Sequence, residues 1–246
     1  VVDGAIKKLY DTGYMHNHAR MWVAAMACNL SKADWHTMGK WMYFHLIDGD
    51  LASNFLSWQW VAGTSVNKRY TVNQDLIDDC RDVKQEGTWL AVERDDFLTM
   101  EVPEHLKQHE PFLYEMEYPE TSVATVLNES VCLYTPWTLD PLWRANEMSV
   151  RRILVIDPEW FDQYPVSSEV LDFIVRQGQT VIQDMELFVG DPKDISGINE
   201  AKVYVKNHQT NLRWPGEREE SEKLFPEVSG YFQSFFKYWQ QAEKYL

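Results

Sequence analysis

The feature that most constrains the fold is a change of hydrophobic period near Leu127. Before it, apolar residues recur three and four positions apart, which is typical of amphipathic helices. After it come short, β-branched, largely apolar runs: SVCLYT, RRILVID, MELFVG and KVYVKN. Helical patterns lie between the later runs, notably at residues 167–177, and this alternation favours a parallel sheet of about four strands. The sequence therefore predicts a mixed fold, with an all-α part (1–127) followed by an α/β, Rossmann-like domain (128–246) whose sheet is mainly parallel.

Helix boundaries in the first part follow from residues that begin and end helices. Asp34 precedes an apolar period and is a preferred N-cap residue, whereas Gly13 and Gly63 stand where two periods stop. The chain also begins inside an amphipathic helical pattern and not with methionine, so we expect it to start within a domain. The predicted helices lie at residues 2–12, 17–30, 35–47 and 50–61, with shorter ones near 73–83 and 104–108.

Composition argues against several classes of site. The cysteines, Cys28, Cys80 and Cys132, are far apart and match no metal-binding spacing, so no metal site is predicted. Free thiols are typical of a reducing compartment, and we expect a cytoplasmic protein. No apolar run approaches membrane-spanning length, so no membrane partner is expected. No glycine-rich turn follows a predicted strand, which argues against a Rossmann-type dinucleotide site.

Charge is divided unevenly along the chain, whose formal net charge is -15. Residues 1–70 carry seven Lys or Arg and five Asp or Glu, a net +2. Residues 71–246 carry the other 16 and 33, a net -17. Such acidity argues against indiscriminate binding of polyanions. If nucleic acid binds, we expect it to bind the first part.

Two helix faces carry side chains that could bind a ligand or take part in catalysis. Each combines polar and large side chains at helical spacing: Asn17, Arg20 and Met21 in one, Asp50, Asn54 and Trp58 in the other. A carboxylate at the start of the second helix, such as Asp48, is favoured there and can pair with a buried Arg20. Such faces can hold a planar, hydrogen-bonding cofactor between packed helices. The alternative is a helical core with one structural ion pair.

The segments TGYMHN-x-x-RM and LIDGD-x-A-x-N-x-x-x-WQW-x-AG carry a family resemblance. Over about residues 1–70 they closely resemble the FAD-binding domain of the DNA photolyase/cryptochrome superfamily. The stretches RRILVIDPEWFDQYPVS, KNHQTN and LFPEVSGYFQSFFKYW resemble a bacterial photolyase-like subfamily whose α/β domain follows the FAD domain. The resemblance implies that this chain is the C-terminal portion of such a flavoprotein, with a partial FAD-binding domain.

The resemblance assigns a role to individual residues. Asn54 would face flavin N5, and an amide there suits a photolyase-like flavin because it can hydrogen-bond both redox states of N5. Trp58 and then Trp35 would pass electrons to the photoexcited flavin, so these three form the implied catalytic set. Met21 and Trp60 would lie at the substrate mouth, where a flipped pyrimidine dimer stacks. The implied FAD-binding residues are Tyr14, Asn17, Arg20, Met42, Asp48, Asp50 and Asn54, with Arg20 and Asp48 as an ion pair.

Two departures from the family pattern bear on function. His18 stands where an Arg is usual, and it is a weaker phosphate contact. The Ser/Thr-rich loop that holds the FAD pyrophosphate has no counterpart before Val1, so we expect this chain alone to bind FAD weakly or not at all and to be inactive. The implied function of the intact protein is light-driven repair of pyrimidine dimers in damaged DNA, a lyase reaction. The alternative is a cryptochrome-like photoreceptor or a non-catalytic flavin-binding module; the photoproduct, an antenna chromophore and the oligomeric state stay open.

Overall fold

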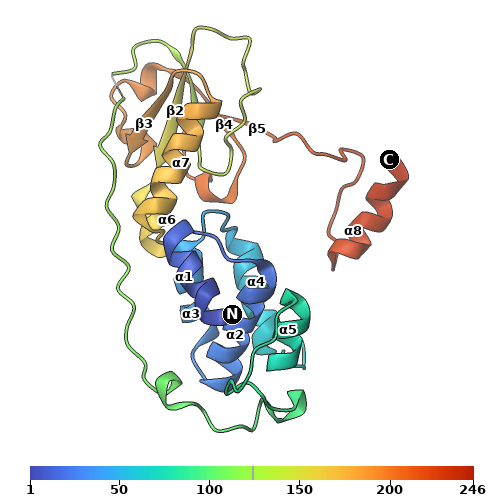
Figure 1. The fold of residues 1–246 in the computed structure, drawn as a ribbon. Coiled ribbons are helices and arrows are strands. Elements are labelled where there is room, and N and C mark those ends of the chain that lie inside the picture. Colours follow the sequence, from blue (N-terminus) through green and yellow to red (C-terminus); the bar gives the residue numbers. More distant parts are fainter. Residues whose placement is uncertain (124) are drawn as a thin grey trace. The chain divides into compact units, whose positions relative to one another are not determined.

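A computed structural model describes residues 1–123 and 125–246 (Figure 1). Contacts within the chain define two compact units, Val1–Pro119 with Asp157–Gln177, and Glu120–Ile156 with Gly178–Leu246. The predicted domain boundary at residues 127 and 128 stays a prediction. The α-helices are α1 (Val2–Thr12), α2 (Asn17–Ala24), α3 (Trp35–His45), α4 (Leu51–Ala62), α5 (Gln74–Arg81), α6 (Pro158–Gln163), α7 (Ser168–Val181) and α8 (Phe235–Ala242). The strands are β1 (Ser130–Tyr134), β2 (Val150–Ile156), β3 (Met185–Val189), β4 (Lys202–Lys206) and β5 (Glu217–Glu219).

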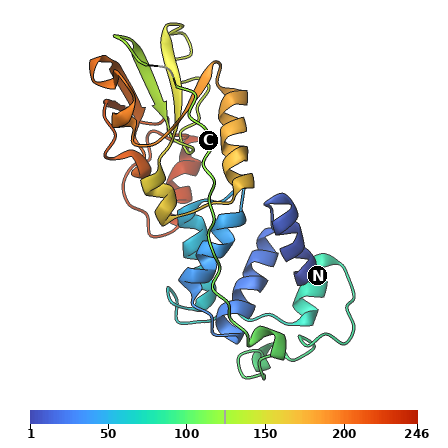
Figure 2. The same cartoon turned by 90° about the vertical axis from the view of Figure 1, so that its left-hand side faces the viewer.

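Helices α1 to α4 form the centre of the first unit, and both views show them gathered together (Figures 1 and 2). Their ends are set by the residues expected from the sequence. Asp34 caps α3 by accepting a 2.7 Å hydrogen bond from the Thr37 amide, while Gly13 and Gly63 end α1 and α4 in the left-handed conformation. The core between the helices includes several fully buried large side chains: Leu9, Trp22, Met42 and Trp58. Helices α1, α3 and α4 confirm three of the predicted helices of this region, with ends shifted by a residue or two.

The second predicted helix, however, is not a single α-helix. Residues Ala25–Leu30 form a π-helical turn, η1, after α2. Asn29 in this turn is 1% exposed, and its Nδ2 donates 2.8 Å hydrogen bonds to the carbonyl oxygens of Val61 and Tyr70. Such wide turns are often found next to functional sites. The predicted helix near 104–108 is also different, since only a single 3-10 turn, Glu104–Leu106, forms there.

The second unit contains a parallel sheet with strand order β3-β2-β1-β4-β5 among the described residues. Its first four strands lie in the four predicted runs, so the predicted parallel α/β fold is confirmed. One face of the sheet is apolar, and its buried side chains include Val131, Leu133, Ile153, Val155, Val203 and Val205. Within the described residues, no helix is long and apolar enough to cross a membrane.

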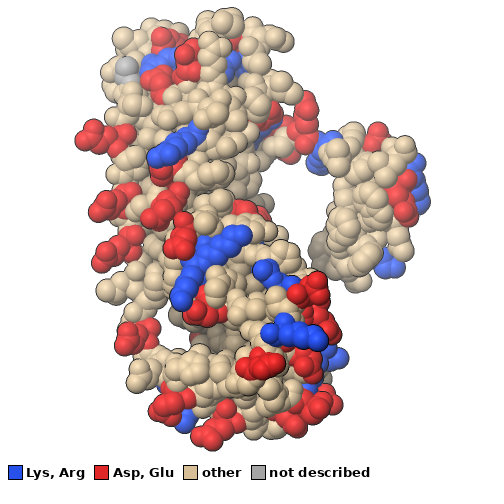
Figure 3. Space-filling view, in the orientation of Figure 1, with Lys and Arg blue, Asp and Glu red and all other residues tan. Residues whose placement is uncertain are grey.

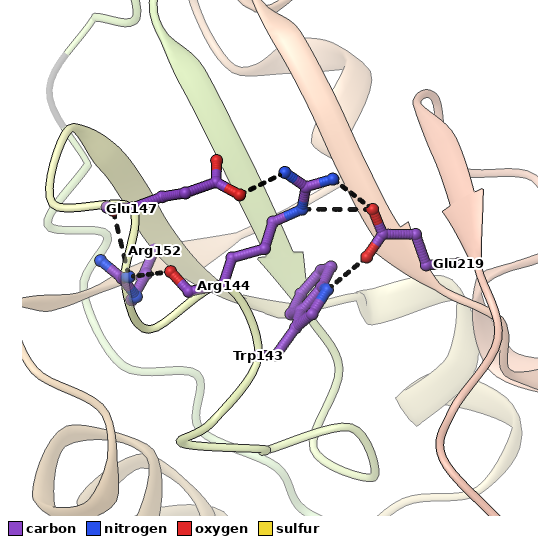
Figure 4. Close-up of polar contacts among 5 residues, drawn as sticks. All are labelled: Trp143, Arg144, Glu147, Arg152 and Glu219. Atoms are coloured by element: carbon purple, nitrogen blue, oxygen red, sulfur yellow. Dashed lines mark hydrogen bonds and ion pairs between the residues drawn. The ribbon is translucent and has the colours of Figure 1, made fainter.

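Strand β5 was not predicted, because its sequence, ERE, has no apolar pattern. Backbone pairing with β4 and charged side-chain contacts hold it instead (Figure 4). Glu219 pairs with the Arg144 guanidinium and accepts a 2.6 Å hydrogen bond from Nε1 of Trp143. The guanidinium also lies 3.4 Å from the ring centroid of Tyr204 on β4. Because Arg144 stabilises the ionised carboxylate, the pKa of Glu219 lies below its usual range.

Candidate functional site

A pocket of about 200 Å³ lies among α2, α3, α4 and the α3–α4 turn, all in the first unit. Helical spacing explains its lining, because residues three and four apart share one face of a helix. The predicted site residues that line it are Asn17, Arg20, Met21, Met42, Asp48, Asp50, Asn54 and Trp58. The structure thus brings both predicted stripes to one pocket, although the roles of these residues stay predictions.

Arg20 and Asp48 form the ion pair that was expected. Nη2 of Arg20 lies 2.8 Å from both carboxylate oxygens of Asp48, and its Nε donates a 2.7 Å hydrogen bond to the Met15 carbonyl. Asp48 lies in the turn before α4 and not on a helix. The expectation of a buried arginine is wrong: the side chains are 24% and 47% exposed, because this pair stands at the pocket rim. An anionic or hydrogen-bonding ligand could therefore reach the guanidinium.

Asp50 begins α4 at the same rim. Its Oδ1 accepts a 2.7 Å hydrogen bond from the Ser53 amide, which caps the helix. A capping carboxylate is held in place by this bond and by the helix dipole. Figure 3 shows acidic and basic side chains interspersed over the face that it displays.

Asn54 projects from α4 one turn after Asp50. Its Nδ2 donates a 2.9 Å hydrogen bond to the carbonyl of Gly39 on α3. This bond fixes which end of the amide is the donor. Within the described residues no hydrogen bond to Oδ1 of Asn54 is found, so the acceptor and the second N–H are the groups that a ligand could use.

Trp58 closes the inner end of the pocket and is 2% exposed. It packs against α3 where Gly39 has no side chain: an added methyl group would lie 3.5 Å from Cγ of Trp58. Gly39, near the start of α3, thus lies beside residues well along α4, whereas Gly49, just before α4, lies beside the ring of Tyr43 near the end of α3. The helices thus pack antiparallel, as the short link between them favours.

Four predicted residues do not line this pocket. Tyr14 is 38% exposed, and the Arg20 guanidinium carbon lies 5.8 Å from its ring centroid. His18 stacks on Trp22 with 6.2 Å between ring centroids. Their rings therefore belong to the surface beside the pocket.

The other two are tryptophans. Trp35 begins α3, is partly buried, and meets Phe55 edge-on at 6.4 Å between centroids. Trp60 is 44% exposed. It lies two residues after Trp58, a rotation of about 200° around the helix, so it faces away from the pocket. Its neighbour is Tyr70, with 5.5 Å between ring centroids.

Sequence reasoning missed part of the lining. The missed residues are Ala24, Leu46, Gly49, Ser53, Ser57 and Val61. Three of them, Ser53, Ser57 and Val61, continue the stripe of Asn54 and Trp58 on α4, so helical spacing could have found them. Ala24 and Gly49 leave room for the pocket because their side chains are small or absent. A small residue in a sequence does not by itself indicate a pocket.

The pocket fits part of a flavin and not a whole dinucleotide. Pockets for drug-sized ligands span about 300–1,000 Å³, more than the about 200 Å³ found between these helices. The hydrogen-bonding groups of Asn54 and the guanidinium of Arg20 suit the polar edge of a planar ring system. No group of three His, Cys, Asp or Glu side chains in residues 1–123 and 125–246 is placed to hold a metal ion.

Comparison with known proteins agrees with this geometry. Residues 1–94 match the family model described as the FAD binding domain of DNA photolyase. The deoxyribodipyrimidine photo-lyase of Streptomyces griseus is 42% identical over 69 residues, which are 28% of this chain and 15% of the relative. That of Escherichia coli K12 is 40% identical over 67 residues, 27% of this chain and 14% of the relative. No solved structure matches the chain at a significant level.

The matches thus lie in the unit that contains the pocket, and the chain spans only about one-seventh of the length of these relatives. In sequence, residues 1–94 are thus similar to the FAD binding domain of DNA photolyase.

Proposed function

We propose that the pocket between α2 and α4 binds the ring end of FAD and that the protein acts in light-driven repair of pyrimidine dimers in DNA. The observation that carries this proposal is the convergence of Arg20, Asp48, Asn54 and Trp58 on one pocket, in the segment with photolyase-like sequence. When bound, the flavin would supply the light-driven electron transfer.

The chain's own residues would bind and orient the ring. Arg20, held by Asp48, would keep a positive charge at the rim, where it favours an electron-rich flavin. Asn54, fixed by its bond to Gly39, would present an amide to the reactive edge. Buried Trp58 would shield this end of the flavin from water and pass electrons to the flavin. Trp35 would be the next member of the chain and pass electrons to Trp58. His18, Met21 and Trp60 stay the proposed contacts of the DNA substrate.

Flavin binding by the 246-residue chain tests the first half of the proposal. We expect saturable quenching of FMN or FAD fluorescence, with weak affinity. Asn54→Leu should weaken it about tenfold, since an unmade hydrogen bond to a buried polar group costs about 1–3 kcal/mol. The matched control is Asn67→Leu, at an exposed position of the same unit. Equal loss of flavin binding in both variants would contradict the proposal.

A second candidate is a cryptochrome-like photoreceptor or a non-catalytic flavin-binding module. The observation that favours it is His18, which stacks on Trp22 where the family has an arginine for phosphate. The two functions are separated by irradiating the flavin-loaded protein with an oligonucleotide that contains a thymine dimer. Repair supports the lyase, whereas photoreduction of the flavin without repair supports the photoreceptor.

A further inference from the structure

A second pocket lies within the first unit, among α1, the π-turn η1, α3, α5 and the segment at residues 85–106. Its volume is about 580 Å³. Pockets that bind small molecules span about 300–1,000 Å³, so this one is large enough for a ligand of its own. Met26 and Ala27 of η1 form part of its wall, and wide turns of this kind are often found next to functional sites.

Helices α2 and α3 separate this pocket from the proposed flavin pocket. Arg20 of α2 and Met42 of α3 line the flavin pocket, whereas Val23 of α2 and Met38 of α3 line the second pocket. Successive residues of a helix point about 100° apart, so one helix can present different faces to two sites. The second pocket is therefore a separate site.

The walls of the second pocket are mainly apolar and partly aromatic. They include the rings of Trp41 and Trp89 and the flexible side chains of Met26 and Met38. Indole rings pack well against other flat rings, and methionine adapts its shape to the group that it contacts. No lysine or arginine among residues 1–123 and 125–246 lines this pocket, so it offers no cationic side chain to a phosphate or carboxylate. These walls suit a flat ligand without charge.

The segment that carries Trp89 is held in place by hydrogen bonds to α5. The Gln85 backbone amide and its Nε2 donate 2.8 and 2.7 Å hydrogen bonds to the two carboxylate oxygens of Asp78. The Thr88 hydroxyl donates a 2.8 Å hydrogen bond to the side-chain oxygen of Gln74. This wall is thus ordered before any ligand arrives, which lowers the entropy cost of binding.

We propose that the second pocket binds a flat, uncharged, fused-ring aromatic molecule, whose rings contact Trp41 and Trp89. The proposal rests on the volume, the apolar and aromatic lining and the preformed wall, and it does not depend on flavin binding. Ala27 lines the pocket with a single methyl group, so a larger side chain there would occupy the space that the ligand needs.

Nile red, an uncharged fused-ring dye that fluoresces strongly in apolar surroundings, is the probe for the 246-residue chain. We expect saturable binding of one dye per chain. The free energy of unfolding in urea should rise with dye concentration, because the dye binds the folded state. The anionic dye 1-anilinonaphthalene-8-sulfonate should bind at least about tenfold more weakly, since its sulfonate would be buried without a partner.

Ala27→Leu fills part of the pocket and should weaken Nile red binding at least about tenfold. Its stability in urea should stay the same or rise, because filling a cavity adds apolar contacts. The matched control is Ala52→Leu, at an exposed position of α4. A second control is Phe236→Ser on α8, which removes a ring that is 76% exposed and could attract the dye. Both controls should keep the wild-type affinity.

Several results would overturn this proposal. They are unsaturable dye binding by the wild type, unchanged affinity in Ala27→Leu, loss of binding in Phe236→Ser, and equal affinity for the anionic dye. Should Ala27→Leu fail to fold, Trp89→Leu removes one aromatic wall and should also weaken binding. The rise in wild-type stability with dye concentration needs no variant, and its absence would contradict binding to the folded chain.

Discussion

The Arg20 guanidinium holds both carboxylate oxygens of Asp48 at 2.8 Å and so joins α2 to the α3–α4 turn. The third contact of this guanidinium, from Nε to the Met15 carbonyl, fixes its plane. Since water reaches nearly half of the Asp48 side chain, the pair is screened. Its geometry is therefore suited to placing a charge at the pocket rim more than to stabilising the fold.

A double-mutant cycle with Arg20→Gln and Asp48→Asn measures this balance. We expect a coupling free energy of about 0.2–1 kcal/mol in urea unfolding, as for other exposed pairs. Flavin affinity should fall in both single variants, because the charge or its orientation is lost. A coupling of about 3 kcal/mol or more, typical of buried pairs, would contradict this interpretation.

The close approach of α3 and α4 at Gly39 gives a second prediction. A methyl group there would lie 3.1 and 3.2 Å from two ring carbons of Phe55, which is tight. We expect Gly39→Ala to destabilise the chain by about 1 kcal/mol in urea unfolding. Overpacking costs about 1–3 kcal/mol, more than the gain of about 0.5–1 kcal/mol from replacing a helical glycine.

The matched control is Gly4→Ala in α1, where an added methyl group has nothing within 4 Å. This variant should stabilise by about 0.5–1 kcal/mol, because only the helix propensity changes. Equal stabilisation by both alanines would show that the ring of Phe55 moves aside at little cost.

Much of this fold could be predicted because its signals are local. The helices of residues 1–63 have regularly spaced apolar residues and clear capping residues. Asp34 caps the start of α3 and Gly63 ends α4, as expected. Four of the strands are apolar runs that only a buried parallel sheet accommodates. The pocket stripes followed from helical spacing, since residues four apart must share a face.

The rest depends on contacts between distant residues. Strand β5 pairs with β4, and its Glu219 contacts Arg144, a partner 75 positions away. The π-turn at Asn29 depends on the carbonyls of Val61 and Tyr70, which are likewise far along the chain. The outward direction of Trp60 was, by contrast, available from spacing, because it stands two residues from Trp58.

Thiol chemistry gives a third prediction. Burial raises the pKa of Cys28 and of Cys132 to about 12, whereas Cys80 is exposed. The thiolate is the reactive form, so Ellman's reagent at about pH 8 should label one of the three cysteines quickly in the native chain and all three in urea. Cys80→Ser should remove the fast phase. A fast phase that survives this change would mean that a buried thiol is accessible.

His45 on α3 lies in an aromatic surrounding that disfavours its charge. Tyr10, Trp41 and Phe112 surround the ring, with centroids 4.8, 5.9 and 5.6 Å away. Its buried Nε2 has no hydrogen-bond partner among the described residues. Burial lowers the pKa of His45, and the carboxylate of Glu169 opposes this only in part.

Stability should therefore fall when the solution is acidified through the histidine range. The unfolded chain, with a histidine pKa of about 6.5, takes up the proton before the folded chain does. Between that pH and the lower pKa of folded His45 the unfolded state binds more protons, so the free energy of unfolding decreases as the pH drops. His45→Phe keeps the ring and removes the proton site, so its advantage over the wild type in urea unfolding should grow from about pH 7.5 to about pH 5. His109→Gln, at an exposed histidine, is the control for general effects of acid. A stability difference between His45→Phe and the wild type that does not change with pH would mean that His45 is charged in the fold or neutral in both states.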